Sequence, residues 1–310
     1  MIHIKTKFKN WRRMAWRQRY LLILALPAVA WLAVFHYIPI AGIQIAFKNF
    51  KFKTGIWGSD WVGIKHFSQL FHDVTIVNAV VNTLAISTLK LVLLFPVPII
   101  FALLLNEISR LRFKRVVQTI SYFPHFIAYS VVALMISILL AKNGVVNDIL
   151  LHLGVLREPY LFLGEKNAFW WILVVTDGWK NTGWNSIIYI AALTAVPLEL
   201  YEAATIDGAN RWQKIISITL PCIKPTIVML LIIAMGNIVR SADFDMSYLL
   251  SNPLNIDRAE ILPTYVMRTG IGMGRFSYAT AIGIVQSLVS LLLVLSANTA
   301  SRYLSDEGLF

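Results

Sequence analysis

The sequence predicts an all-α polytopic membrane protein with six transmembrane helices, and three observations support this fold class. Of the 310 residues, 57% are hydrophobic and only 14% are charged, whereas soluble domains are about half apolar and about a quarter charged. The mean hydropathy is +0.66. Six apolar stretches reach the roughly 20 residues that a helix needs to cross the hydrocarbon core of a bilayer.

The six apolar stretches follow one another along the chain, at residues 20–47, 75–105, 119–141, 168–196, 222–240 and 276–300. They divide the chain into four parts: a basic N-terminal segment (1–19), a first transmembrane helix (20–47), a core with five further transmembrane helices (75–300) and a tail (301–310). The first 30 residues also resemble a secretory signal, with small residues at Ala28 and Ala30. The apolar run continues to Phe47, however, which is too long for a signal core and suits a membrane span.

Basic residues indicate the orientation, because they accumulate in cytoplasmic loops. Residues 1–19 contain seven basic residues and no acidic residue. With an even number of spans, this bias predicts that both termini are cytoplasmic. The N-terminal segment, with Trp11 and Trp16, could also lie on anionic lipid as an amphipathic helix, but orientation alone accounts for its charge.

Motifs of soluble enzymes and metal sites are missing from the sequence. There is no GxxxxGK[ST] phosphate loop, so the chain is not expected to bind ATP itself. The six histidines are scattered without HExxH or CxxC motifs, so we expect no metal site. The single cysteine, Cys222, excludes an intrachain disulfide. The net charge of +12 could indicate binding to nucleic acid or to a membrane surface, and the long apolar runs favour the membrane.

The loop at 197–221, between the fourth and fifth stretches, has the features of a docking element. Pro197 can open a helix, and Pro221 can end or kink one. Gly208 lowers helix propensity by about 1 kcal/mol, so we expect it to mark a turn between two short helices. Ala203 and Ala204 are small and allow another surface to approach the backbone. Such an element suits docking to a soluble partner.

The same loop resembles the EAA loop of binding-protein-dependent ABC importer permeases. The resemblance rests on Glu202-Ala203-Ala204, on Gly208, and on Ile218-x-Leu220-Pro221. It extends from about Asn78 to the sixth stretch, and includes Asn82-Thr83-Leu84 and Asn106-Glu107. The segment Phe35-His36-Tyr37-Ile38-Pro39 is similar to the carbohydrate, polysaccharide-type members of this family.

The resemblance implies a type I ABC importer permease fold in a bacterial cytoplasmic (inner) membrane. It also implies four kinds of partner: a second permease subunit (we expect a different chain), two ATP-binding cassette ATPase subunits that carry ATP and Mg²⁺, an extracytoplasmic solute-binding protein, and an oligosaccharide. The permease itself is then not an enzyme. The implied ATPase-coupling residues are Glu202, Ala203, Ala204, Asp207, Gly208, Arg211, Trp212 and Pro221.

Polar residues within the predicted spans are candidates for the translocation pathway, because charge inside a membrane is costly and must be compensated. We select Lys90, Asp177, Lys180, Trp179, Asn181, Asn237 and Gln286. Asp177 and Lys180 lie three residues apart, so they occupy neighbouring positions on one face of the helix. Structural pairing and pathway lining both remain open for them, and the tryptophans also suit the interfacial belt.

Lys90 has no evident partner in the sequence. An acidic sugar of alginate or pectin type, or a carboxylate of the companion permease, could compensate it. The alternative function, an ion-coupled secondary transporter, predicts repeated halves with broken helices and a protonatable carboxylate. Only Asp177 could serve as that carboxylate, and no repeat is visible.

Overall fold

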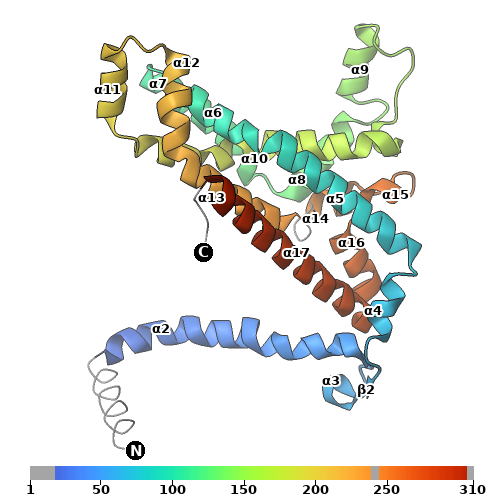
Figure 1. Cartoon of the computed structure of the whole chain (residues 1–310). Helices are drawn as coiled ribbons and strands as arrows, with labels where there is room; N and C mark the ends of the chain where they lie inside the picture. Colours follow the sequence, from blue (N-terminus) through green and yellow to red (C-terminus); the bar gives the residue numbers. More distant parts are fainter. Residues whose placement is uncertain (1–17, 239–243, 306–310) are drawn as a thin grey trace, which may run out of the picture.

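The computed structural model describes residues 18–238 and 244–305, and most of them form helices (Figure 1). The N-terminal half contains α2 (Arg19–Leu32), η1 (Ala33–Tyr37), η2 (Ile38–Phe47), β1 (Lys48–Asn49), α3 (Gly55–Gly58), β2 (Asp60–Trp61), α4 (Lys65–Leu70), α5 (Val74–Leu94), α6 (Pro96–Asn106), α7 (Leu111–Tyr122), η3 (Phe123–Phe126), α8 (Tyr129–Leu139) and α9 (Val145–His152). The C-terminal half contains η4 (Phe162–Gly164), α10 (Lys166–Thr194), α11 (Leu198–Ile206), α12 (Arg211–Lys214), η5 (Ile215–Thr219), α13 (Leu220–Asn237), α14 (Phe244–Leu250), α15 (Ile256–Ala259), α16 (Leu262–Met267), η6 (Arg268–Gly272) and α17 (Phe276–Ser305).

Four uninterrupted helices in the described part of the chain are long and apolar enough to cross a membrane: Arg19–Phe47, Val74–Asn106, Arg211–Asn237 and Phe276–Arg302. Two bent pairs raise the number to six if each counts as one span: α7–η3 with α8, and α10 with α11. These positions correspond to the six predicted stretches. Residues 1–17, most of the predicted basic segment, lie outside the described residues, as do Arg240 and positions 306–310 of the tail.

The third span is not the single helix expected at 119–141. Its two halves bend by 97° at a short break between Phe126 and Tyr129. Pro124 lies just before this break and has no backbone N–H, and Ile127 and Ala128 adopt ψ values of 130° and 143°, which are not helical. The extended backbone at Ile127 and Ala128 ends the ladder of helical hydrogen bonds shortly after Pro124, and the chain changes direction there.

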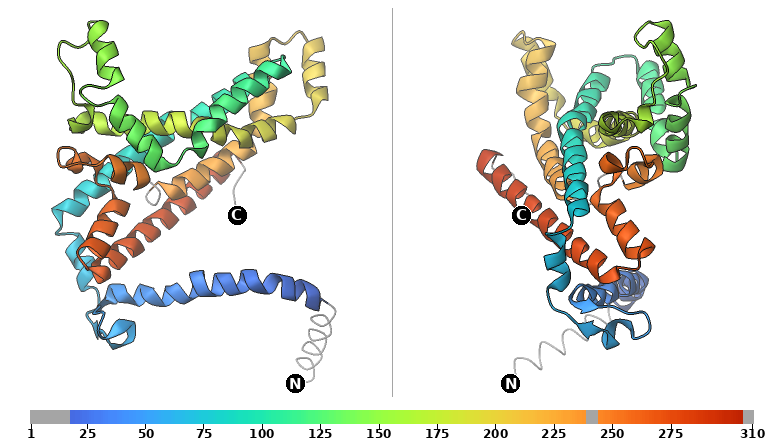
Figure 2. Two further views of the ribbon diagram at one scale, coloured as in Figure 1. Left: turned by 180° about the vertical axis from the view of Figure 1, so that it is seen from behind. Right: turned by 90° about the vertical axis from the view of Figure 1, so that its right-hand side faces the viewer.

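The first span lies apart from the other helices over most of its length (Figures 1 and 2). None of the residues in its most hydrophobic window is buried. Its last part, η2, packs on α17, and Ala46 is fully buried there. A two-residue antiparallel pair, β1 with β2, follows directly, with Lys48 opposite Trp61.

Helix α10 is the centre of the remaining bundle, because it packs against α5, α6, α7 and α13. Phe169 and Leu173 at its start belong to one buried cluster with Ile86 of α5 and Val132 of α8. Tyr189 and Leu193 near its end belong to another, with Ala102 of α6. Helix α10 thus connects the end of the bundle that carries α11 and α12 to the opposite end, which carries α9 and α14–α16 (Figure 1).

The opposite end is held together by hydrogen bonds around Asp73, which caps α5. Thr75 N donates to Asp73 Oδ1 at 3.0 Å, and Tyr265 and Tyr278 donate their hydroxyls to Oδ2 at 2.5 and 2.8 Å. Burial alone raises the pKa of Asp73, but these hydrogen bonds outweigh it and lower the pKa below its ordinary value. Asp73 therefore joins α5, α16 and α17 as a carboxylate.

Candidate translocation cavity and coupling helix

The predicted coupling loop forms two short helices joined by a turn. Helix α11 bends by 70° away from α10, and α12 continues through η5 into α13. Gly208 lies in the turn with φ +76°, which confirms the expected turn and favours glycine. Asn210 starts α12 with a capping box: Gln213 N donates to Asn210 Oδ1 at 2.9 Å, and Asn210 N donates to Gln213 Oε1 at 2.7 Å.

The coupling residues implied by the sequence lie on an accessible surface. Glu202, Ala203, Asp207, Gly208, Arg211, Trp212 and Pro221 are exposed, and Ala204 is partly buried. Trp212 is 73% exposed and Ile206 is 88% exposed, which are large values for apolar side chains. Pro221 does not end the helix: it lies in the first turn of α13, and the π-helical turn η5 (Ile215–Thr219) directly precedes that helix. Exposed apolar side chains next to a small-residue turn suit a protein–protein contact.

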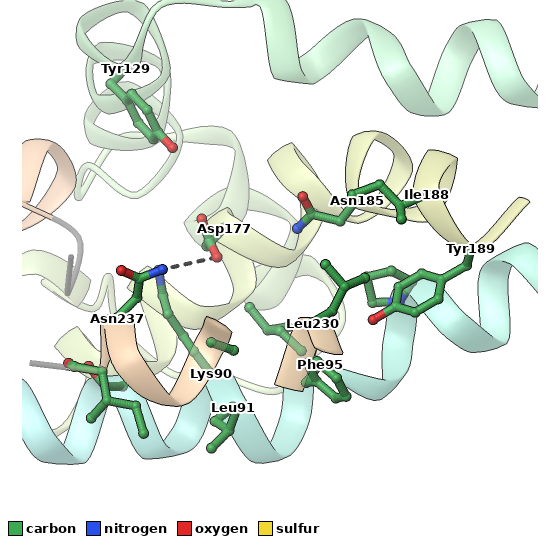
Figure 3. A pocket seen from close by; sticks show the side chains of 15 residues that line it. Lys90, Leu91, Phe95, Tyr129, Asp177, Asn185, Ile188, Tyr189, Leu230 and Asn237 are labelled. Carbon is green, nitrogen blue, oxygen red and sulfur yellow. Dashed lines mark hydrogen bonds and ion pairs between the residues drawn. The ribbon is translucent and has the colours of Figure 1, made fainter. Parts of the chain in front are cut away.

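A cavity of about 430 Å³ lies between α5, α6, α10 and α13 (Figure 3). Its polar lining includes Lys90, Asp177, Asn185 and Asn237, and its aromatic lining includes Tyr129, Tyr189 and Phe95. Three of the predicted pathway residues therefore meet in one cavity: Lys90, Asp177 and Asn237. The volume falls within the range of roughly 300–1,000 Å³ that is usual for small-ligand sites.

Lys90 and Asp177 form an ion pair across this cavity. Lys90 Nζ of α5 lies 3.2 Å from Asp177 Oδ2 of α10, and Figure 3 shows the two side chains pointing toward each other. The expectation that Lys90 finds no partner in this chain is therefore wrong. The other possible partner of Asp177, Lys180, makes its own hydrogen bonds to backbone carbonyls.

Lys180 is buried, with 2% exposure, and stabilises the break in the third span. Its ammonium donates to the carbonyl oxygens of Pro124 at 3.1 Å, His125 at 2.7 Å and Ile127 at 2.6 Å. It also lies 4.7 Å from the centre of the Tyr129 ring. An ammonium group has three donors, and here each finds a carbonyl acceptor at the break; the Pro124 carbonyl also accepts a backbone bond from Ile127 N at 3.2 Å.

Asn181 links the ion pair to the broken span. Its Nδ2 donates to Asp177 Oδ1 at 2.6 Å, and its Oδ1 lies 2.9 Å from His125 Nδ1. The His125 ring in turn stacks on Trp184, with ring centres 4.5 Å apart. Asn181 thus positions Asp177 and does not line the cavity itself.

Two other predicted pathway residues lie elsewhere. Trp179 is 48% exposed and faces away from the cavity. Gln286 lines a separate hollow with Phe244, Pro263 and Ser287. Sequence reasoning missed Tyr129, Tyr189 and His125. The only available signal was the Pro124-His125 pair within an apolar stretch, which marks a helix break in a membrane.

Comparisons with known proteins agree with this arrangement. Residues 95–306 match the family described as "Binding-protein-dependent transport system inner membrane component". The chain belongs to this family. It is a multi-pass inner-membrane permease with the fold of type I ABC importer permeases.

The permease is similar to other permeases over nearly their whole length. It is 41% identical over 295 residues to the polygalacturonan/rhamnogalacturonan transport system permease protein YteP of Bacillus subtilis (strain 168), covering 95% of this chain and 91% of the relative. It is 37% identical to the protein LplB of the same organism, covering 97% and 94%. The arabinooligosaccharides transport system permease protein AraP of that organism is 30% identical, covering 91% and 88%.

A solved structure shares the fold of the permease. It is a chain of a bacterial ABC transporter involved in the import of the acidic polysaccharide alginate, with 38% identity and a TM-score of 0.88, covering 96% of this chain and 99% of that chain. A second structure of a bacterial alginate ABC transporter, in complex with a periplasmic protein that binds an alginate pentasaccharide, gives a TM-score of 0.87.

The family match includes α11, α12 and most of the cavity lining, but it begins after Lys90. The ion pair therefore joins a residue outside the matched range to Asp177 inside it.

Proposed function

We propose that this permease is the transmembrane subunit of an ATP-driven importer that carries an acidic oligosaccharide from the outside to the cytoplasm. The observation that carries the proposal is the near full-length similarity to permeases named for polygalacturonan/rhamnogalacturonan and alginate transport. Both polysaccharides are rich in uronates. The Lys90 ammonium in the cavity supports the proposal, because it is a cation within reach of a uronate carboxylate.

The proposed transporter contains a second, different permease subunit and two ATP-binding cassette ATPase subunits, and an extracytoplasmic binding protein delivers the oligosaccharide. ATP and Mg²⁺ are bound by the ATPase subunits. Helices α11 and α12 dock to an ATPase subunit, so the end that carries them faces the cytoplasm. Both termini lie on that side, as the basic N-terminal residues favour.

Coupling uses the continuity of the helices on both sides of the docking element. Helix α10 runs from α11 to the cavity and carries Asp177, Asn185 and Tyr189. On the other side, α12, η5 and α13 lead to Leu230 and Asn237 in the cavity wall. A shift of α11 and α12 on the ATPase therefore moves two walls of the cavity together. ATP binding favours one docking geometry and with it one state of the cavity.

The test is reconstitution of the permease with its companion permease, the ATPase subunits and the binding protein in proteoliposomes. We expect oligogalacturonate or oligoalginate to stimulate ATP hydrolysis and to accumulate in the lumen only when ATP is present on the coupling side. Uptake driven by an ion gradient without ATP contradicts the importer. Stimulation by neutral oligosaccharides alone contradicts the acidic substrate class.

A further inference from the structure

The lysine that lines the cavity, Lys90, is already paired with a carboxylate of the same chain. Lys90 and Asp177 come from different helices, line the same cavity and lie 3.2 Å apart. Their side chains are 17% and 19% exposed, so both charged groups are accessible from the cavity. The second oxygen of Asp177 is held by Asn181 at 2.6 Å. Asp177 and Asn181 both belong to α10, whereas Lys90 belongs to α5, so the ion pair joins these two helices.

We infer that Asp177 is an internal competitor of the substrate: the carboxylate of a uronate unit replaces Asp177 on Lys90 during passage, and Asp177 returns when the sugar leaves. This inference rests on the proposed acidic substrate and names the residues that select it. No covalent bond changes; one carboxylate exchanges for another on the same ammonium.

The chemistry of the three groups permits such an exchange. A uronate and an aspartate present the same carboxylate, and a lysine ammonium is a compact charge without a fixed bidentate geometry. Asp177 does not lose all its partners when it is displaced, because Asn181 still donates to it. The amides of Asn185 and Asn237 and the hydroxyl of Tyr189 line the same cavity and can bond the hydroxyls of a sugar.

The exchange provides both release and selectivity. A transport site must bind its substrate weakly enough to release it, and a resident carboxylate weakens binding because the ion pair has to be broken first. A neutral sugar has no charged group to exchange, so it forms no ion pair with Lys90 and is left with weaker hydrogen bonds from its hydroxyls. Discrimination against neutral sugars then depends on the ion pair, in addition to the contacts with the hydroxyls.

The experiment measures sugar binding to the assembled transporter, with its companion permease and ATPase subunits, in lipid nanodiscs without the binding protein. The probes are oligogalacturonate and the same oligosaccharide after chemical reduction of its carboxylates to hydroxymethyl groups. Isothermal titration calorimetry gives the Kd of each. We expect Asp177→Asn to tighten oligogalacturonate binding about tenfold and to leave the reduced oligosaccharide within about twofold. Lys90→Gln should weaken only oligogalacturonate, by a similar factor.

Matched variants control for folding and charge. Lys90→Arg keeps the cation and should keep the preference for oligogalacturonate. The double variant Lys90→Gln/Asp177→Asn has no uncompensated charge and should bind both oligosaccharides equally, which also tests the inference if a single variant does not assemble. The inference is overturned if Asp177→Asn leaves oligogalacturonate binding unchanged or weaker, or if the double variant keeps the preference for it. If the wild-type transporter prefers the reduced oligosaccharide, the proposed acidic substrate itself fails.

Discussion

The ammonium group of Lys180 donates a 2.6 Å hydrogen bond to the carbonyl oxygen of Ile127, within the break in the third span. The same ammonium bonds the carbonyls of Pro124 and His125. A helix broken within a membrane exposes backbone groups that lipid cannot satisfy. One buried lysine meets three of these acceptors, so the cation and the break stabilise each other.

Lys180→Met should lower the stability of the permease strongly. The substitution removes three hydrogen bonds from a charged donor, of which only the one to Pro124 has a backbone substitute, from Ile127 N, and each lost hydrogen bond to a charged group costs roughly 1.5–3 kcal/mol. We expect a clear decrease in the Tm of the purified protein in detergent. Lys166→Met is the matched control: Lys166 is on the same helix and pairs with Asp257, but their side chains are 52% and 61% exposed. This control should change stability by less than about 1 kcal/mol, and equal effects of the two variants would contradict the role of Lys180.

Gly208→Leu should abolish ATP-coupled uptake while the chain still folds and inserts. A β-carbon at this position meets no atom within 4 Å, so nothing inside the chain is displaced. The φ of +76° disfavours the substitution by about 1–2 kcal/mol, and the side chain projects from the docking turn. Uptake and substrate-stimulated ATP hydrolysis in proteoliposomes are the measurements.

Gly63→Leu separates backbone strain from docking. Gly63 has φ +60° and equally open surroundings, but it lies between β2 and α4, and these elements are far from α11 and α12 (Figure 1). We expect it to lower stability by a similar amount and to keep ATP coupling. If both glycine variants lose coupling to the same extent, backbone strain is the cause and the docking role of Gly208 is wrong.

Cysteine labelling should determine the orientation. In a Cys222→Ser background, a cysteine at Asn210 in the coupling loop should be protected from an impermeant thiol reagent added outside intact cells. A cysteine at Ser251, after α14 at the opposite end, should react. Replacement of Cys222 is needed because this residue is exposed. The reverse labelling pattern would overturn the cytoplasmic assignment of the termini.

The Asp73 carboxylate should make stability dependent on acid pH. Because hydrogen bonds from Tyr265 and Tyr278 outweigh burial and lower its pKa in the folded state, Asp73 stabilises the protein above the pKa of the unfolded chain, about 3.9. That contribution is lost as the pH falls through the lower pKa of the folded state.

The measurement is the Tm of Asp73→Asn and wild type across the acid range. Asparagine keeps the helix cap but weakens the hydrogen bonds from the tyrosines, so we expect a loss of about 1 kcal/mol at neutral pH. The difference from wild type should shrink as the pH falls below about 4. A difference that is constant with pH would show that ionisation of Asp73 contributes nothing.

The spans and the coupling turn could be predicted from the sequence because their signals are local. Twenty apolar residues in a row specify a membrane helix whatever they pack against. Five of the six predicted stretches correspond to continuous helices. One of these five is α10, and the chain bends only after it, where α11 begins. Gly208 signalled the turn by its own backbone freedom, and it has the expected left-handed conformation. The same local residues carried the resemblance to importer permeases.

Only the tertiary structure decided which charges meet. Asp177 and Lys180 are three residues apart, and spacing alone allowed a pair, but α10 lies between α5 on one side and the broken third span on another. Asp177 therefore meets Lys90, 87 positions earlier in the chain, and Lys180 meets the carbonyls around Pro124. The helices that pack around a buried charge determine its partner. Removing a charge from water costs free energy, and only a group within bonding distance can offset that cost. Helix spacing records only which residues share a face, and it contains no information about which helix will cover that face.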